Sequence, residues 1–309
     1  MAVDITALYC CLDDFCKVFA EWETHQLIPS PGRRQRFGKL SRSEMLFIMV
    51  LFHLSPYKNF KTFYLYGIGG QHRACFRDLP HDDRFLSLMP RLFAPLMGLL
   101  HSLSGEETGL YFGDSSKLAV CHNRRIDRHR VFDGLAARGK TSMGWFFGLK
   151  LHFVINHKGQ IMALKITSGN IADSSVLDEI TRHLTGKLYA DKGYISREMF
   201  HTLWQRGLHL ITGIRRNMRN HLMVLGEAGQ GSTGAAGGIA RRGDKIMLRK
   251  RFVIETVLDI LKSEMGLEHT RHRSPVNAMV HVLSCLVAYA HRPGKPSISR
   301  NSKMLEVDP

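Results

Sequence analysis

The spacing of apolar residues changes near residue 110, and this change limits what the chain can fold into. Before that point apolar residues recur every three or four positions, as from Leu8 to Trp22, which predicts amphipathic helices. Ser41 and Glu44 form a capping-box pattern in front of an apolar helix predicted over 45–54. After residue 110, short apolar runs typical of strands alternate with helical patterns. We therefore expect a helical part followed by an α/β part.

The second part of the chain reads as strand, hairpin, helix, strand, helix, strand, helix. The patterns predict strands over 110–112, 145–156, 160–167, 187–190 and 209–214, and helices over 174–184, 196–206, 245–264 and 276–291. The turn His157-Lys158-Gly159 predicts that the second and third strands form a hairpin. This order indicates a mixed sheet with parallel and antiparallel pairs.

Composition suggests where the domains begin and end. We expect an α-helical N-terminal domain over 1–105 and an α/β domain over 106–291. Residues 226–243 are rich in Gly, Ala and Ser, which predicts a flexible loop inside the second domain. Residues 292–309 lack periodicity and are expected to form a disordered tail.

The charge of the chain is strongly positive. It has 43 Lys and Arg against 27 Asp and Glu, a formal net charge of +16. Such a balance indicates a polyanionic partner, with nucleic acid the first candidate and an anionic membrane surface the second. No apolar run approaches the roughly 20 residues of a membrane span, and the N-terminus lacks a signal-like segment. The sequence therefore favours a cytoplasmic location without a membrane.

Three acids have the context of a divalent-cation site. Asp114 and Asp191 each follow an apolar run, and Glu255 lies in a basic helical stretch. Each has a simpler explanation: a turn or cap residue for the aspartates, and an ion pair with Arg251, one helical turn earlier, for Glu255. Together they favour a site for Mg²⁺ or Mn²⁺, because carboxylate oxygens suit these hard cations. The order of the elements is compatible with a ribonuclease-H-like core, in which acids from two strands and a late helix converge.

Basic residues gather in four clusters of the second part. Any one cluster could be a solvated face, but four of them in so basic a chain favour contacts to phosphates. The candidates for DNA contact are Arg124, Arg125, Arg128, Arg215, Arg216, Arg249, Lys250, Arg251, Lys262, Arg271 and Arg273. Lys150 and His152 point to the same side of a strand. His152 could lie near the metals or have a structural role.

Several segments carry a family resemblance. They are Tyr111-Phe112-Gly113-Asp114-Ser115, Asp191-Lys192-Gly193-Tyr194, and the spacing Arg251-x3-Glu255-x6-Lys262. In this order they resemble a bacterial insertion-sequence DDE transposase, and insertion-sequence family 982 in particular. The resemblance covers roughly residues 40–290. One position departs from the fuller signature, which has Tyr three residues before the Arg, where this chain has Leu248.

The resemblance implies a fold, an activity and partners. It implies a ribonuclease-H-like catalytic domain in which Asp114, Asp191 and Glu255 bind two Mg²⁺ or Mn²⁺ ions and catalyse DNA strand cleavage and strand transfer. Arg251 and Lys262 match the signature residues thought to contact DNA. The implied partners are double-stranded DNA, namely terminal inverted repeats and target DNA. A homodimer on DNA in the bacterial nucleoid is the corresponding expectation, with the N-terminal helices as candidates for recognising the DNA ends.

Two other functions remain open from the sequence. The first is another ribonuclease-H-like metal-dependent endonuclease, which would cut DNA without strand transfer. The second is an inactive DNA-binding protein derived from a transposase; the complete set of three acids argues against it, and Leu248 and the Gly-rich segment 226–243 leave it open.

Overall fold

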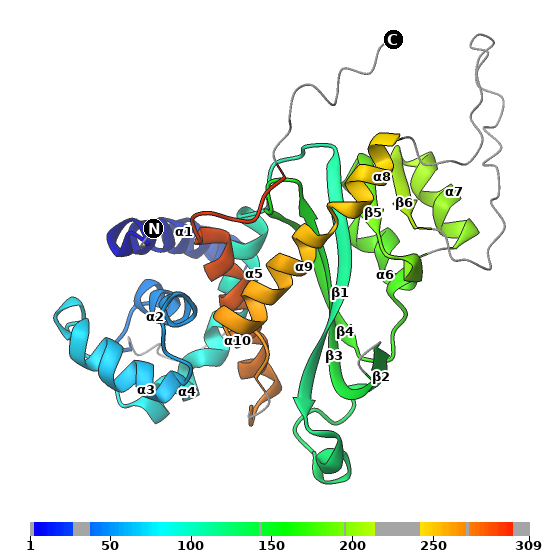
Figure 1. Ribbon diagram of the computed structural model, residues 1–309. Helices are drawn as coiled ribbons and strands as arrows, with labels where there is room; N and C mark the ends of the chain where they lie inside the picture. The colour runs from blue at the N-terminus through cyan, green and yellow to red at the C-terminus, as the bar shows by residue number, and fades with distance from the viewer. Residues whose placement is uncertain are drawn as a thin grey trace, which may run out of the picture.

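A six-stranded mixed sheet with helices on both faces forms the centre of the computed structural model (Figure 1). The structure describes residues 3–26, 38–141, 144–194, 196–213, 242–269 and 272–298. Strand order is β2-β3-β1-β5-β6, and β4 also pairs with β3. The strands are β1 (Leu110–Cys121), β2 (Ala137–Thr141), β3 (Gly144–Asn156), β4 (Ile161–Ser168), β5 (Gly186–Ala190) and β6 (Leu208–Thr212). The pairs of β3 with β1, β2 and β4 are antiparallel, and β5 is parallel to β1 and β6. The predicted mixed α/β class is confirmed.

The first hundred residues are helical where the structure describes them. The elements are α1 (Ile5–Gln26), α2 (Arg42–Leu54), α3 (Phe60–Thr62), a π-helix η1 (Phe63–Gln71), η2 (Arg73–Cys75), α4 (Asp82–Leu88), η3 (Met89–Leu92) and α5 (Phe93–Ser102). The predicted capping box is confirmed. The Ser41 side chain accepts from the Glu44 amide at 3.1 Å, and the Glu44 carboxylate accepts from the Ser41 amide at 2.6 Å. These bonds satisfy two amides at the start of α2 that the helix itself leaves unpaired.

The two faces of the sheet are buried in different cores. Successive residues of a strand point to opposite faces. Phe112 and Leu118 of β1 therefore face α9 (Phe252–Asp259) and α10 (Pro275–His291), in a core that also includes α2 and α5. Tyr111, on the other face, packs in a second core with residues of α6 (Asp173–Ile180) and α7 (Arg197–Gln205). Because α10 contacts α2 and α5, the chain's last described helix joins the N-terminal helices to the sheet.

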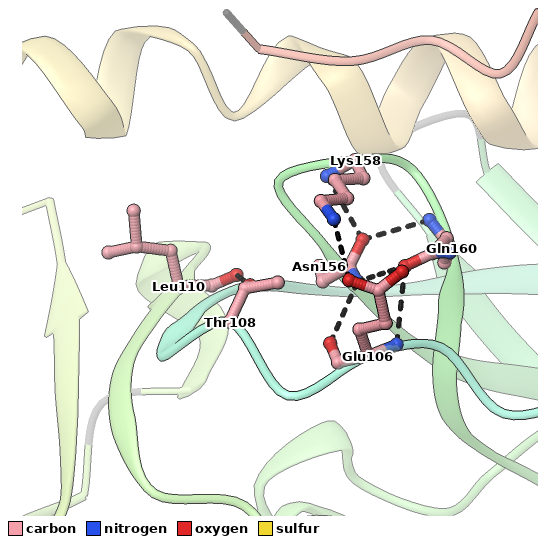
Figure 2. A network of polar contacts seen from close by, with 6 residues as sticks. All are labelled: Glu106, Thr108, Leu110, Asn156, Lys158 and Gln160. Atoms are coloured by element: carbon pink, nitrogen blue, oxygen red, sulfur yellow. Dashed lines mark hydrogen bonds and ion pairs between the residues drawn. The ribbon is translucent and has the colours of Figure 1, made fainter. Parts of the chain in front are cut away.

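A polar network fixes where β1 begins (Figure 2). The Asn156 side chain donates to the Glu106 carbonyl at 3.0 Å and accepts from the amides of Lys158 and Gln160 at 3.0 Å each. Lys158 pairs with the Glu106 carboxylate at 2.6 Å. The chain before β1 is thus held to the β3–β4 turn. This contact sets the register in which Tyr111 faces Asn156 and Asp114 faces Phe153.

Three elements differ from the sequence prediction. Strand β1 does not end at residue 112, because its polar residues from Asp114 to Lys117 stay in the ladder with β3. Tertiary pairing here overrides the turn-like composition. Strand β2 was not predicted. The helix predicted over 245–264 is divided into α8 (Arg242–Arg249), α9 and a π-turn η6 (Ile260–Glu264). Around Lys250 and Arg251 the backbone bonds tighten to three-residue spacing.

Two smaller features complete the frame. The N-cap of α6 is Ala172, and the helix begins at Asp173, one residue before the start expected from the sequence. Of the predicted tail, residues 292–298 are described, and the Ile298 amide donates to the His157 carbonyl at 2.8 Å. Residues 299–309 and most of the Gly-rich segment, 226–241, lie outside the described residues.

Candidate active site

Parallel pairing of β1 and β5 brings Asp114 and Asp191 to the same level of the sheet. The last paired residues are Gly113 and Ala190, so the two aspartates are the next residue on each chain. Phe112 and Tyr189, two residues earlier, stack with ring centroids 5.5 Å apart. The alternation of side chains then places both aspartates on that same face, which is the face covered by α9. Asp191 follows its strand as predicted, whereas Asp114 lies within β1.

Helix α9 brings Arg251 and Glu255 to this face. Val253, Ile254 and Val257 are buried against the sheet, so Glu255 lies on the exposed side of the helix. One nitrogen of Arg251 lies 3.3 Å from Asp114 Oδ2, and the other lies 2.8 Å from Glu255 Oε1. The expected pair of Arg251 with Glu255 is present, but the same guanidinium also pairs with Asp114. Arg251 therefore connects the helix acid with the strand acid.

The pKa of Asp114 reflects its burial and its proximity to the other two acids. Burial and, to a smaller extent, the negative charges of Glu255 and Asp191 raise the pKa of Asp114, while Arg251 and the Ser115 amide oppose the shift; the resulting pKa is about 6. Since desolvation and like charges disfavour the carboxylate, added positive charge would favour it. The donor set consists entirely of carboxylate oxygens, which fits a hard divalent cation.

The three acids are not drawn tightly together. In the described part of the chain, the one set of three possible ligand atoms within 4.8 Å of one another belongs to His81, Asp82 and Asp83. There Asp82 already pairs with His81 at 2.8 Å and Lys61 at 3.4 Å. At the Asp114 site, the Arg251 guanidinium lies between two of the carboxylates. Its positive charge balances acids that would otherwise repel.

A second polar group lies on the opposite face of the sheet from the Asp114 side chain and contacts it through the backbone of Ser115. The Ser115 amide donates to Asp114 at 2.8 Å, and buried Tyr194 hydrogen-bonds the Ser115 side chain, with burial raising the tyrosine pKa. Tyr194 was not predicted to have a role, and its place in Asp-Lys-Gly-Tyr was the signal that could have identified it. Tyr194 thus links the turn after Asp191 to the strand that carries Asp114.

His152 lies in this group and is buried. Its Nε2 lies 2.9 Å from the Thr167 hydroxyl, and its Nδ1 lies 3.6 Å from Asp173, which also pairs with Lys150 at 3.2 Å. Burial lowers the pKa of His152 to about 4. Ser115, its partner in the ladder, points to the same face. His152 is therefore on the face opposite Asp114, and the structure favours the structural reading.

The basic candidates lie in different surroundings. Arg124, Arg125 and Arg128 are exposed on the 3-10 helix η4 (Asn123–Arg128), and Arg249 and Arg273 are also exposed. Lys250 is partly buried. Lys262 donates to the Lys117 carbonyl at 2.8 Å and lies 3.4 Å from Glu268, so its charge is used within the fold. Arg215, Arg216 and Arg271 lie outside the described residues. No helix in the described part is long and apolar enough to cross a membrane.

A cavity of about 510 Å³ lies away from the three acids, between α2 and the segment 262–281. Four of its lining residues are histidines: His53, His269, His272 and His281. Buried His53 has Nδ1 2.7 Å from the Met265 carbonyl and Nε2 3.1 Å from the Ser284 hydroxyl. His281 Nε2 lies 2.8 Å from the Gly266 carbonyl. These contacts tie α2 and α10 to the chain that follows η6, which is a structural role.

The chain is similar to known proteins in its sequence and in its fold. Residues 104–229 and 236–275, more than half of the chain, match the family model described as transposase DDE domain. The matched segments contain Asp114, Asp191 and Glu255. A comparison with curated proteins finds no match.

Among solved structures, the piggyBac transposase synaptic complex with hairpin DNA is similar with a TM-score of 0.50 at 10% identity. The similarity covers 94% of this chain and 74% of that one, and it concerns the fold alone. The Mos1 mariner paired end complex with Mn has a TM-score of 0.23 at 11% identity, covering 94% of this chain and 97% of that one. The Mos1 strand transfer complex also has a TM-score of 0.23 at 11% identity, covering 89% and 86%. We conclude nothing about the fold from the last two.

Proposed function

The chain belongs to the transposase DDE domain family, and from this premise we propose that it cleaves DNA strands at the ends of a mobile element and joins them to target DNA. The observation that carries the proposal is the contact of Arg251 with both Asp114 and Glu255, at 3.3 and 2.8 Å. It brings a helix acid to a strand acid 141 positions earlier, beside a second strand acid at the same level. An ordinary ion pair within one helix would not require that arrangement.

We propose that Asp114, Asp191 and Glu255 bind two divalent cations, Mg²⁺ or Mn²⁺. When bound, such cations would activate the attacking water or 3′ hydroxyl and stabilise the leaving oxygen at phosphorus. Asp114 is the most buried of the three acids, and its pKa is raised mainly by that burial, with smaller contributions from the charges of Glu255 and Asp191. Arg251 holds Glu255 against β1 and supplies positive charge beside Asp114. Tyr194 and Ser115 hold the strand and the turn that carry the two aspartates.

DNA is the proposed partner, and its phosphates would meet the exposed basic residues. Arg249 and Lys250 directly precede Arg251, and Arg124, Arg125, Arg128 and Arg273 lie further away. We keep Arg215, Arg216 and Arg271 as proposed contacts on sequence grounds. Lys262 instead connects η6 to the sheet, because its ammonium group donates to the Lys117 carbonyl on β1.

Several finer points belong to the same proposal. We propose that the element is a bacterial insertion sequence of a kind resembling family 982, and that the sheet with its acids is a ribonuclease-H-like catalytic domain over 106–291. The helices of residues 1–105 would recognise terminal inverted repeats, and residues 292–309 would form a tail. Because two DNA ends must be joined to one target, a homodimer on DNA is the proposed assembly.

The experiment is a cleavage and strand-transfer assay on labelled DNA carrying the inverted repeats that flank the coding region, with Mg²⁺ or Mn²⁺. Wild type is compared with Glu255→Ala and with a matched control, Asp259→Ala, which removes another exposed acid of α9. We expect joined products from wild type and the control and none from Glu255→Ala. Cleavage without joining would support an endonuclease instead. Binding without cleavage by all three proteins would support an inactive DNA-binding protein.

A further inference from the structure

The chain between β1 and the start of β3 forms a basic tip at the end of the sheet away from α8 (Figure 1). The tip consists of η4, the turn after it, β2 and the first residue pairs of β3. Residues 122–145 contain six Lys and Arg and two Asp. This concentration of charge is separated from the three acids by most of the length of β1.

The arginines of the tip are exposed and available. Arg124, Arg125, Arg128 and Arg130 are all exposed. Within the described residues, none of these four guanidinium groups forms an ion pair with an acid, and Asp127 reaches only Arg138, at 4.0 Å. Arg251 and Lys262 differ from them, because both are paired with acids of the fold. Unpaired charge held in water can bind phosphates without first breaking an internal contact.

Contacts between its elements hold the tip in one arrangement. The Asn123 side chain donates to the Trp145 carbonyl at 2.8 Å, which ties η4 to the β2–β3 hairpin. His129 stacks on buried Phe132 with centroids 5.8 Å apart, and it meets the Phe147 ring edge-on at 6.1 Å. A positively charged surface that is already ordered loses less conformational entropy when it binds.

An exposed aromatic side chain accompanies the charges. Trp145 is 63% exposed, and the Lys140 ammonium lies 5.6 Å from its ring centroid. Cations beside an exposed aromatic ring are typical of surfaces that bind nucleic acids, where the ring packs against a base or sugar. An acidic protein segment would use the cations but would leave the tryptophan exposed.

We propose that this tip binds the backbone of double-stranded DNA about seven base pairs from the phosphate that the acids cleave. Strand β1 advances seven residues from Asp114 to Cys121, or about 23 Å at roughly 3.3 Å per residue. One base pair occupies about 3.4 Å of a duplex, so this length corresponds to about seven base pairs of a duplex that runs along β1. The position of the cleaved phosphate rests on the proposed function. The choice of DNA as the partner of Arg124, Arg125 and Arg128 rests on it too; the inference adds that the tip is one ordered surface with Trp145 and gives its distance from the acids.

The first test measures binding in EDTA, without chemistry, on a random duplex of about 20 base pairs at several salt concentrations. Wild type is compared with Arg124→Ala/Arg125→Ala/Arg128→Ala and with Lys17→Ala/Arg84→Ala/Arg182→Ala, a control with the same loss of charge at exposed positions. The tip variant should reduce the slope of log affinity against log salt by about 2.7, at about 0.9 per lost phosphate contact. The control should change it by less than one. Equal changes in the two variants would overturn the proposal.

Trp145 gives a local readout that does not depend on charge removal. DNA binding should quench tryptophan fluorescence in wild type, and most of this quenching should be absent in Trp145→Phe, while Trp204→Phe keeps it. Quenching unchanged in Trp145→Phe, or found only with single-stranded DNA, contradicts a duplex site at the tip.

The spacing is tested with DNA ends in which methylphosphonates neutralise single phosphates at stepwise distances from the cleaved bond. Apart from the phosphates next to the cleaved bond, wild-type cleavage should weaken most when the neutral phosphate lies about seven base pairs away. The triple tip variant should be insensitive there. The same profile in both proteins would overturn the spacing. If no protein cleaves, the proposed function fails, while the salt slopes still decide whether the tip binds DNA.

Discussion

Two groups of titratable side chains in this protein differ in whether their members are charged. Around Asp114 the charges are kept: an arginine pairs with two acids, and a third acid lies close enough to raise the pKa of Asp114. Around His53 and His281 the rings are kept neutral, because burial lowers the pKa of both. The first group is charged and lies beside solvent. The rings of the second group are neutral and hydrogen-bond backbone carbonyls.

The comparison separates a chemical site from a structural one. The 510 Å³ cavity lies beside the histidines, so concavity alone would have selected the wrong group. Perturbed pKa values occur in both groups and do not separate them either. What distinguishes the acids is that α9, β1 and β5 each bring a charged residue to one partly exposed point. The following changes test that distinction, from the largest expected effect to the smallest.

Removal of a proposed cation ligand should have the largest effect. Asp191→Asn and Glu255→Gln should each reduce strand cleavage by more than about 100-fold, because loss of an outer-shell partner alone usually costs about 10–100-fold. DNA binding in EDTA should stay within a few-fold of wild type. Cleavage by either variant at the rate of Asp259→Asn would remove that acid from the proposed site.

Arg251 should have an intermediate effect. Arg251→Ala removes the contacts to Asp114 and Glu255, so cleavage should fall by about 10–100-fold as the acids lose their relative positions. Arg251→Lys keeps the charge but cannot pair with two carboxylates in the same forked way. It should recover only part of the rate. Full activity of Arg251→Ala in single-turnover cleavage would show that the bridge has no role in positioning.

Asp114→Asn should make the metal-free protein more stable. The pKa of Asp114 rises from 3.8 to about 6 on folding, so the folded state binds the proton more tightly. Stability is therefore lost as pH rises from 3.8 through 6, by about 2 kcal/mol after allowance for the partial exposure of the carboxylate. Asn removes that loss. In EDTA at pH 7.5 the urea midpoint of the variant should be higher than that of wild type. A lower midpoint would contradict the cost of burying the Asp114 carboxylate beside the other two acids.

The histidine group should respond in the opposite direction. Burial lowers the pKa of His281 to about 4 and of His272 to about 3, against 6.5 in the unfolded chain. Stability should be complete above pH 6.5 and fall as pH decreases below it, because the unfolded state then binds more protons. At pH 5.5 each histidine contributes about 1 kcal/mol of this loss. His272→Gln should reduce the loss of unfolding free energy between pH 7 and 5.5 by about that amount, as measured by urea unfolding at both pH values. A loss as large as that of wild type would contradict the prediction.

Local patterns predicted much of the fold, and tertiary contacts decided the rest. The Ser41 capping box, the β3–β4 hairpin and the mixed α/β class followed from residues close together in the sequence. The length of β1 did not, because Asp114 to Lys117 look like a turn until β3 pairs with them. The break before α9 was equally hidden, since the apolar spacing continues through Lys250 and Arg251.

The candidate site divides in the same way. Spacing on a helix predicted the contact between Arg251 and Glu255. It could not predict that the same arginine reaches Asp114, 137 positions earlier, because that contact depends on how α9 crosses the sheet. Tyr194 was missed because a tyrosine after a Lys-Gly turn looks like a core residue. Its hydrogen bond to Ser115 depends on the pairing of β1 with β5.

The start of α8 has a practical consequence. Buried Asp244 pairs with Lys187 at 2.9 Å and accepts from the Tyr189 hydroxyl at 2.9 Å, both on β5. The helix that leads to Glu255 is thus attached to the sheet by its own first turn, whatever the chain does between Gly213 and Arg242. The Gly-, Ala- and Ser-rich sequence 226–241 in this interval is a suitable place to insert a fluorescent domain or an affinity tag, because segments of small and polar residues tolerate insertions. Such a fusion would let assembly on DNA be followed in a protein whose three acids have not moved.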